Sequence, residues 1–235
     1  MSVKVEQLTK SYGQQKAVDN ISFSAEAGSI LGFLGPNGAG KSTTMKVISC
    51  FIPPTAGNVS LCGYDVAVDP IQVRRNLGYL PEHNPLYLDM YVKESLSFIA
   101  GIHQIANKAQ RINEVIELTG LGVEKHKKVG ELSKGYRQRV GIAQAIIHDP
   151  KVLILDEPTS GLDPNQLIEI RNLIKELGKT KTVILSTHIM QEVEAICDKV
   201  VIINKGKIVA DDTLKKIKEE YANQTLEGIF LSLTR

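Results

Sequence analysis

Hydrophobic positions along the chain follow two different periods. Near the start, residues 3–8 have strand-like spacing, and Ile21, Phe23 and Ala25 alternate with polar residues. Alternation with a period of two places the apolar side chains on one face of a half-buried strand. The first part of the chain is therefore predicted to be rich in strands.

Short apolar runs later in the chain predict buried strands. These runs are Ile30–Leu34, Val152–Leu155 and Thr182–Ser186. Helices are predicted at Lys41–Ile48 and from about residue 165 to residue 177, and residues 199–209 are predicted to form a hairpin around Lys205 and Gly206.

The middle of the chain, from about residue 90 to residue 148, has a helical period instead. One helix face carries Val92, Leu96, Ile99 and Ala100. A second face carries Ile112, Val115, Ile116 and Thr119, and it ends at Gly120. This order of elements predicts an α/β core with an inserted helical subdomain. We expect one domain, with residues 1–88 and 150–235 as its core and residues 89–149 as the helical subdomain.

Composition and charge narrow the class of protein. Of the 235 residues, 43% are hydrophobic and 23% are charged, which is ordinary for a globular protein. The net charge of +2 and the scattered lysines argue against a dedicated nucleic-acid binder. No apolar run approaches the ~20 residues that span a bilayer. Cys50, Cys62 and Cys197 follow no metal-ligand spacing, so reduced thiols in a cytoplasmic protein are expected.

A phosphate-binding motif follows the first buried strand. The segment fits the pattern GxxxxGK[ST], with a predicted strand before it and a predicted helix after it. Glycines let backbone N–H groups approach phosphates, Lys41 can reach the β and γ phosphates, and Ser42 can coordinate Mg²⁺. The predicted nucleotide-binding residues are Gly35, Pro36, Asn37, Gly38, Ala39, Gly40, Lys41, Ser42 and Thr43.

Two carboxylates follow the strand Val152–Leu155 directly. Asp156 is suited to hold Mg²⁺, and Glu157, one residue further out, can act as a general base for the attacking water. Acidic residues also end strands as simple solvent-facing groups. After a phosphate-binding loop, however, four apolar residues and two carboxylates favour the catalytic interpretation.

Further motifs are more specific. Leu132-Ser133-Lys134-Gly135-Tyr136 resembles the signature of ABC ATPases, usually LSGGQ, and residues 160–163 resemble their D-loop. With the phosphate motifs, this order makes residues from about 3 to 212 resemble an ABC transporter ATP-binding subunit. The resemblance implies a P-loop NTPase (RecA-like) core with an N-terminal antiparallel β subdomain and an inserted α-helical subdomain. It also implies ATP and Mg²⁺ as cofactors.

The resemblance assigns further residues to the site. It implies that Ser133 and Gly135 contact the γ phosphate and that Asp163 belongs to the nucleotide site. His188 is similar to the family's switch histidine, which makes His188 catalytic together with Glu157 and Lys41. Tyr12 resembles the aromatic residue that stacks on adenine, with Val18 beside it. A tyrosine in a turn is also often only half-buried packing, which is the alternative for Tyr12.

Glu82 departs from the family pattern, which commonly has glutamine there. Glutamate keeps an oxygen that can bind the metal and adds a negative charge. This substitution, together with the altered signature, resembles the ABC-2 exporter branch. Residues 81–92 more narrowly resemble gliding-motility-associated ABC ATP-binding proteins of bacteria.

The two phosphate-recognising elements imply a partner. The family forms a head-to-tail dimer in which each ATP lies between the P-loop of one copy and the signature of the other, and we expect a homodimer. A transmembrane permease subunit is also expected, which would place the chain on the inner face of the cell membrane. Residues 82–91 are the expected docking region. Their apolar members could also pack onto the first subdomain helix; these are Pro85, Leu86, Tyr87 and Met90.

Two other classes of protein fit the sequence less well. An ABC-type ATPase of DNA repair needs long coiled coils or zinc inserts, but the chain has no sustained heptads and no paired CxxC. Translation-type ATPases usually carry two cassettes in one chain, whereas one is present here. A regulatory protein that binds ATP without hydrolysing it is disfavoured by the intact catalytic set of Lys41, Asp156, Glu157 and His188.

Overall fold

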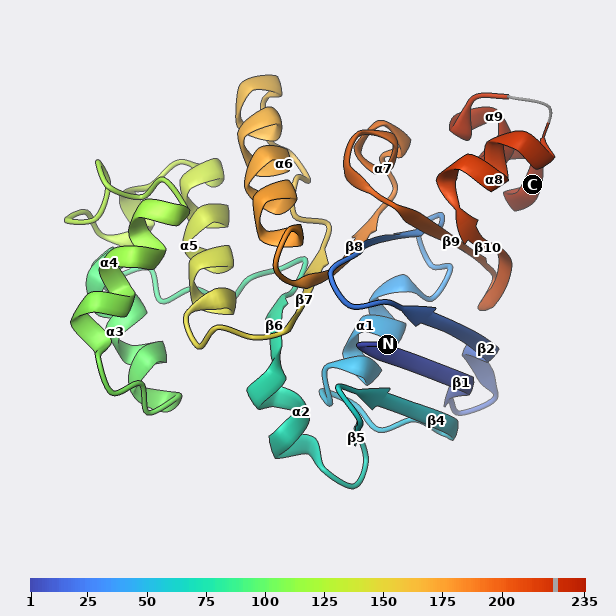
Figure 1. Ribbon diagram of the computed structural model, residues 1–235, viewed down its shortest axis with the longest axis horizontal. Helices are drawn as coiled ribbons and strands as arrows, with labels where there is room; N and C mark the ends of the chain where they lie inside the picture. The colour runs from blue at the N-terminus through green and yellow to red at the C-terminus, as the bar shows by residue number, and fades with distance from the viewer. Residues whose placement is uncertain (222–223) are drawn as a thin grey trace.

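Two β-sheets form the centre of the molecule, with helices around them (Figure 1). The computed structural model describes residues 1–221 and 224–235. The smaller sheet has the order β2-β1-β4-β5, and its paired strands are antiparallel. Its strands are β1 (Val3–Tyr12), β2 (Gln15–Ala25), β4 (Ala56–Leu61) and β5 (Tyr64–Asp65).

The larger sheet has six strands in the order β10-β9-β3-β8-β7-β6. Neighbouring strands from β9 to β6 are parallel, and the edge strand β10 is antiparallel to β9. The strands are β3 (Ile30–Leu34), β6 (Leu77–Leu80), β7 (Val152–Asp156), β8 (Thr182–Thr187), β9 (Lys199–Asn204) and β10 (Lys207–Thr213). Parallel strands end at the same edge, so the polar residues that follow β3, β6, β7 and β8 gather there.

Both faces of the larger sheet are buried, which explains its continuous apolar strands. In β3, Leu31 and Phe33 face a core shared with the antiparallel sheet and α1. Ile30 and Leu34 on the same strand face a second core, shared with the helices on the other side. The Phe23 and Phe33 ring centroids lie 5.1 Å apart in the first core. The period of two therefore directs each strand into both cores.

Three helices lie together at one end of the molecule (Figure 1). They are α3 (Val92–Ile102), α4 (Lys108–Leu118) and α5 (Lys134–Ile146). Their buried side chains belong to the same core as one face of the larger sheet. Gly120 has a φ of 67° just after α4, as expected for a residue that ends a helix. The helical pattern predicted for the middle of the chain is therefore confirmed.

The other helices connect and cover the strands. They are α1 (Lys41–Ile48), α2 (Pro70–Asn76), the 3₁₀ helix η1 (Val129–Glu131), α6 (Pro164–Gly178), α7 (Met190–Ile196), α8 (Leu214–Glu220) and α9 (Leu226–Thr234). α9 contacts α7 and β9, and Asn204 Nδ2 donates a hydrogen bond to the Leu233 carbonyl at 3.4 Å. In residues 1–221 and 224–235, no helix is long and apolar enough to cross a membrane.

Candidate functional site

The glycine-rich loop joins β3 to α1, and its shape depends on glycine at three positions. Gly38 and Gly40 have φ of 78° and 110°, which side chains rarely adopt. A Cβ atom at Gly35 or Gly40 would lie 2.5 Å from the backbone oxygen of Ile203 or Ala17, respectively. Neither backbone oxygen can move aside easily. The loop therefore runs close to its neighbours and leaves backbone N–H groups for an anion.

Lys41 begins α1 and is only 7% exposed. Its Nζ donates a hydrogen bond to the Gly35 carbonyl at 2.8 Å and lies 3.6 Å from Glu157 Oε1. The amine is thus held over the loop, with a carboxylate beside it. Thr44, one turn further, donates from its hydroxyl to the Gly40 carbonyl at 2.9 Å and anchors the start of the helix.

Asp156 ends β7 with 1% of its surface exposed. Burial raises the pKa of Asp156, and the Ser186 and Ser42 hydroxyl groups partly oppose that rise. The Oδ1 atom is buried and has no hydrogen-bond partner within the described part of the chain. A buried oxygen without a partner, beside the Ser42 hydroxyl, fits a hard cation such as Mg²⁺, which binds through one or two carboxylates and phosphate oxygens. The residues present therefore fit the predicted metal.

Glu157 follows in a left-handed backbone conformation with a φ of 52°. Its amide donates to the Ser186 carbonyl at 2.8 Å, which ties the turn to β8. The carboxylate is 7% exposed, and its Oε2 accepts a hydrogen bond from His188 Nδ1 at 2.8 Å. The Glu157 carboxylate thus lies between the Lys41 amine and the His188 imidazole, so the structure brings the three residues predicted to be catalytic together.

Two cavities adjoin these groups. One of about 300 Å³ is lined by residues 36–38 and 40–43 of the loop region together with Ala17, Glu82 and Glu157. The other, of about 330 Å³, is lined in part by Ser42, Tyr79, Glu82 and Asp156. Ser42 and Glu82 line both cavities, so the structure brings the predicted metal-binding residues to one place.

The two residues predicted to lie at the adenine, Tyr12 and Val18, differ in exposure. Tyr12 ends β1 with 52% of its surface exposed, and Lys10 Nζ lies 5.4 Å from its ring centroid. Val18 has 0% exposure and packs in the core beneath Gly40. Val18 thus packs behind Gly40 in this conformation, and its contact with the nucleotide stays a prediction.

The signature segment forms a separate place in the fold. Ser133 caps α5 and accepts a hydrogen bond from the Tyr136 amide at 3.4 Å, and Asp163 caps α6 by accepting from the Gln166 amide at 2.9 Å. Gly135 is buried against the Gln166 side chain. As far as the structure describes the chain, Ser133, Gly135 and Asp163 do not line the two cavities above. The structure groups these residues with one another and not with the P-loop.

Sequence reasoning missed two residues of the nucleotide region. Ala17 lies on β2 beside Gly40 and lines the loop cavity, and no sequence pattern marks it. Ser186 lies opposite Asp156 in the pairing of β7 with β8. A polar residue that ends an apolar run, directly before Thr187 and His188, could have indicated Ser186.

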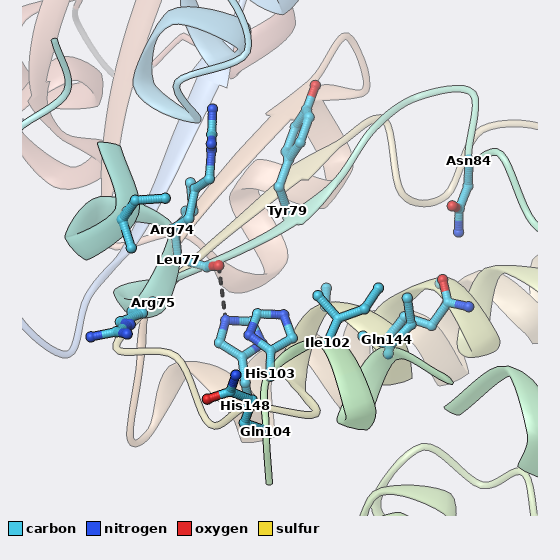
Figure 2. Close-up of a pocket in the computed structure, with 14 residues that line it drawn as sticks. Arg74, Arg75, Leu77, Tyr79, Asn84, Ile102, His103, Gln104, Gln144 and His148 are labelled. Carbon is cyan, nitrogen blue, oxygen red and sulfur yellow. Dashed lines mark hydrogen bonds between the residues drawn. The ribbon is translucent and has the colours of Figure 1, made fainter. Parts of the chain in front are cut away.

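A larger cavity of about 570 Å³ lies between α2, β6, α3 and α5 (Figure 2). Its walls include Arg74, Arg75 and Tyr79. The His103 and His148 rings stack there with centroids 3.9 Å apart, and His148 Nε2 donates to the Leu77 carbonyl at 3.0 Å. Burial and then the neighbouring His103 lower the pKa of His148 to about 4.

Comparison with known proteins gives consistent results. The family model described as "ABC transporter" matches residues 18–160. The bacitracin transport ATP-binding protein BcrA of Bacillus licheniformis is 41% identical over 227 residues, covering 93% of this chain and 73% of the relative. The ABC transporter ATP-binding protein NatA of Bacillus subtilis (strain 168) is 36% identical, covering 92% of this chain and 90% of the relative.

A solved structure described as "Structure of ATP binding subunit of ABC transporter" superposes with a TM-score of 0.90 at 30% identity, covering 100% of each chain. This likeness confirms the predicted fold class, with its antiparallel sheet, its P-loop core and its helical insertion. The family match, the relatives and the phosphate-site geometry lead to one conclusion: the chain belongs to the family of ABC transporter ATP-binding subunits.

Proposed function

We propose that the chain hydrolyses ATP to drive transport through a separate transmembrane partner. The observation that carries the proposal is the position of the Glu157 carboxylate. It lies 3.6 Å from the Lys41 amine and accepts a hydrogen bond from His188 at 2.8 Å. A carboxylate held beside a phosphate-binding lysine is suited to orient a water molecule for attack on a γ phosphate.

The bound ATP would lie along the glycine-rich loop. Backbone N–H groups of residues 35–40, with Ser42 and Thr43, would hold its phosphates, and Tyr12 would stack on the adenine. Ser42, Asp156 and Glu82 would hold Mg²⁺, which supplies positive charge to the phosphate oxygens. Lys41 would neutralise developing charge at the γ phosphate, and His188 would keep Glu157 oriented.

A second copy of the chain would complete each site. The N-terminal end of α5, with Ser133 and Gly135, would contact the γ phosphate held by the other copy, and Asp163 would lie at the same interface. Support comes from the separation of this segment from the P-loop cavities. A two-fold head-to-tail homodimer makes two equivalent sites, and the γ phosphate would favour the closed form because it bridges both faces.

The membrane partner would dock on the 570 Å³ cavity and the loop beside it. Leu86 of this loop packs against the core, whereas Tyr87 stays 59% exposed with its ring edge-on to Phe98, at a centroid distance of 6.0 Å. Tyr87 therefore packs against α3 through its ring edge and still leaves more than half of its surface for a partner. The exposed part would contact a permease at the inner face of the cell membrane.

The finer assignments are proposals as well, and one relative and the motifs support them. The description of BcrA as a bacitracin transport protein, with Glu82 and Lys134 of this chain, supports export and the ABC-2 branch. The gliding-motility resemblance of residues 81–92 is a narrower form of the same proposal. We also propose one domain, with residues 1–88 and 150–235 as the nucleotide-binding core and residues 89–149 as the helical subdomain.

The test compares the parent chain with Glu157→Gln, with phosphate release and light scattering as measurements. Losing the carboxylate removes the base, so Glu157→Gln should lose about 100-fold or more in turnover. It should keep ATP affinity and form a dimer that ATP stabilises. Glu176→Gln, at an exposed pair with Lys179, is the control and should behave as the parent.

Equal turnover in the parent and Glu157→Gln would contradict the proposal. ATP binding without phosphate release in the parent, alone and with a permease, would favour a regulatory ATP-binding protein instead.

A further inference from the structure

A buried carboxylate lies behind the catalytic residues. Glu192, on α7, has 0% of its surface exposed. One of its oxygens accepts a hydrogen bond from the Thr159 hydroxyl, and the other accepts from the Thr187 hydroxyl at 2.8 Å. Both threonines are themselves buried, with exposures of 3% and 0%. Glu192 thus joins two segments that are distant in the sequence.

The two threonines lie in different segments, one near each of the hydrogen-bonded residues Glu157 and His188. Thr159 lies two residues after Glu157, and Thr187 directly precedes His188. The Thr187 hydroxyl also accepts a hydrogen bond from the Ile189 amide at 3.1 Å, so the backbone is held on both sides of His188. Glu157 and His188, whose side chains are hydrogen-bonded at 2.8 Å, are therefore also connected through Glu192 and the two threonines.

The chemistry of the position supports a role beyond packing. Burying a carboxylate costs free energy unless hydrogen bonds replace its hydration. Val193 and Cys197 of the same region belong to a hydrophobic core, where an apolar side chain would avoid that cost. The Glu157 backbone also has a φ of 52°, a conformation that persists where its surroundings hold it. A link between the two turns is the benefit that the carboxylate provides.

We propose that Glu192 is a positioning residue for ATP hydrolysis, holding Glu157 and His188 in their hydrogen bond without touching the nucleotide. The inference rests on the proposed ATPase function. The position of Glu192 agrees with a positioning role. Among the described residues, those that line the two cavities of the nucleotide region do not include Glu192.

The test uses matched threonines on one strand. Thr187→Val removes a hydroxyl at the catalytic end of β8. Thr182→Val removes one at the other end, where the residue is 1% exposed and bonded to Ser2 and Glu26. We expect Thr187→Val to lower kcat by about tenfold or more, because small misplacements of catalytic groups have large effects. The KM for ATP should stay within about twofold, and Thr182→Val should keep the parent kcat.

Two substitutions of Glu192 are expected to differ in the size of their effect on kcat. Glu192→Ala should lower kcat at least as much as Thr187→Val. Glu192→Gln keeps polar atoms within reach of both hydroxyls and should restore most of the rate. Hydrogen exchange should show faster exchange in residues 157–163 and 187–192 of Glu192→Ala and Thr187→Val, but not of Thr182→Val.

Two outcomes would overturn the inference. One is equal kcat in Thr187→Val and Thr182→Val, and the other is unchanged exchange of residues 157–163 in Thr187→Val and Glu192→Ala. If the parent hydrolyses no ATP, the proposed function fails by itself. The exchange comparison then still decides whether Glu192 couples the two segments.

Discussion

The P-loop and the signature segment both precede a helix N-terminus, yet they are built differently. In the P-loop, Gly40 has a φ of 110°, and a Cβ there would meet the Ala17 backbone at 2.5 Å. In the signature, Gly135 lies inside α5, and a Cβ there would meet the Gln166 side chain at 2.6 Å. Backbone cannot move aside, whereas a glutamine side chain can change rotamer.

The difference shows where each phosphate site is completed. The P-loop is shaped by contacts within the chain and has Lys41, Asp156, Glu157 and His188 around it. The signature has a helix cap and an adaptable neighbour, Gln166, which suits a surface that forms its contacts with a second copy. We therefore expect changes in the P-loop to affect the single chain, and changes in the signature to affect only the assembled dimer.

The largest effect is expected for Gly40→Ala. Strain at the positive φ and the clash with Ala17 should lower the free energy of unfolding by about 3 kcal/mol and distort the loop. ATP binding by the single chain should fall by about 100-fold. Urea unfolding and a fluorescent ATP analogue measure the two effects.

Gly28→Ala is the matched control for that change. Gly28 has a φ of 70°, but a Cβ there would meet nothing within 4 Å. It should lose only about 1 kcal/mol of stability through strain and keep ATP affinity. Equal losses in both variants would show that the P-loop is no more constrained than an ordinary turn.

Asp156→Asn should separate stability from activity. Because burial raises the pKa of Asp156, the folded state disfavours the charged form at neutral pH. Asparagine removes that charge and should raise the free energy of unfolding at pH 7. The gain should shrink as the pH falls and Asp156 becomes protonated. Mg²⁺-dependent hydrolysis should fall by about 100-fold, and a variant with lower stability at pH 7 would contradict the argument.

The sequence predicted the parts of the site that depend on local pattern. A strand, a glycine-rich turn and a helix around Lys41 are consecutive, so spacing alone placed them correctly. The four-residue strand β6 before Glu82 was not predicted, because Gly78 interrupts a very short apolar run. Contacts between distant segments were also out of reach. They include the burial of Val18 beneath the loop and the link from Glu192 to two turns.

Gly135→Ala tests the signature side of the comparison. Gln166 can move, so the free energy of unfolding should change by less than about 1 kcal/mol, and ATP affinity of the single chain should be unchanged. Hydrolysis and ATP-dependent dimerisation should fall by about tenfold, because the added methyl group alters the face presented to the other copy. Loss of ATP binding by the single chain would mean that one chain uses both elements.

The smallest effect concerns the contact between the core and the helical region, where His148 stacks on His103 and bonds to Leu77. The pKa of His148 is lowered from 6.5 to about 4 in the folded chain. As the pH falls through this range, His148 therefore becomes protonated in the unfolded chain but stays neutral in the folded chain. Stability is therefore lost between pH 6.5 and 4. Relative to His148→Gln, the parent should lose about 1 kcal/mol between pH 7.5 and pH 5, measured by urea unfolding at each pH. If the free energies of unfolding of the parent and His148→Gln change in parallel with pH, a neutral His148 does not hold the two regions together. If the two curves converge as the pH falls, the contact between the ATP-binding part and the part with the signature is sensitive to acid.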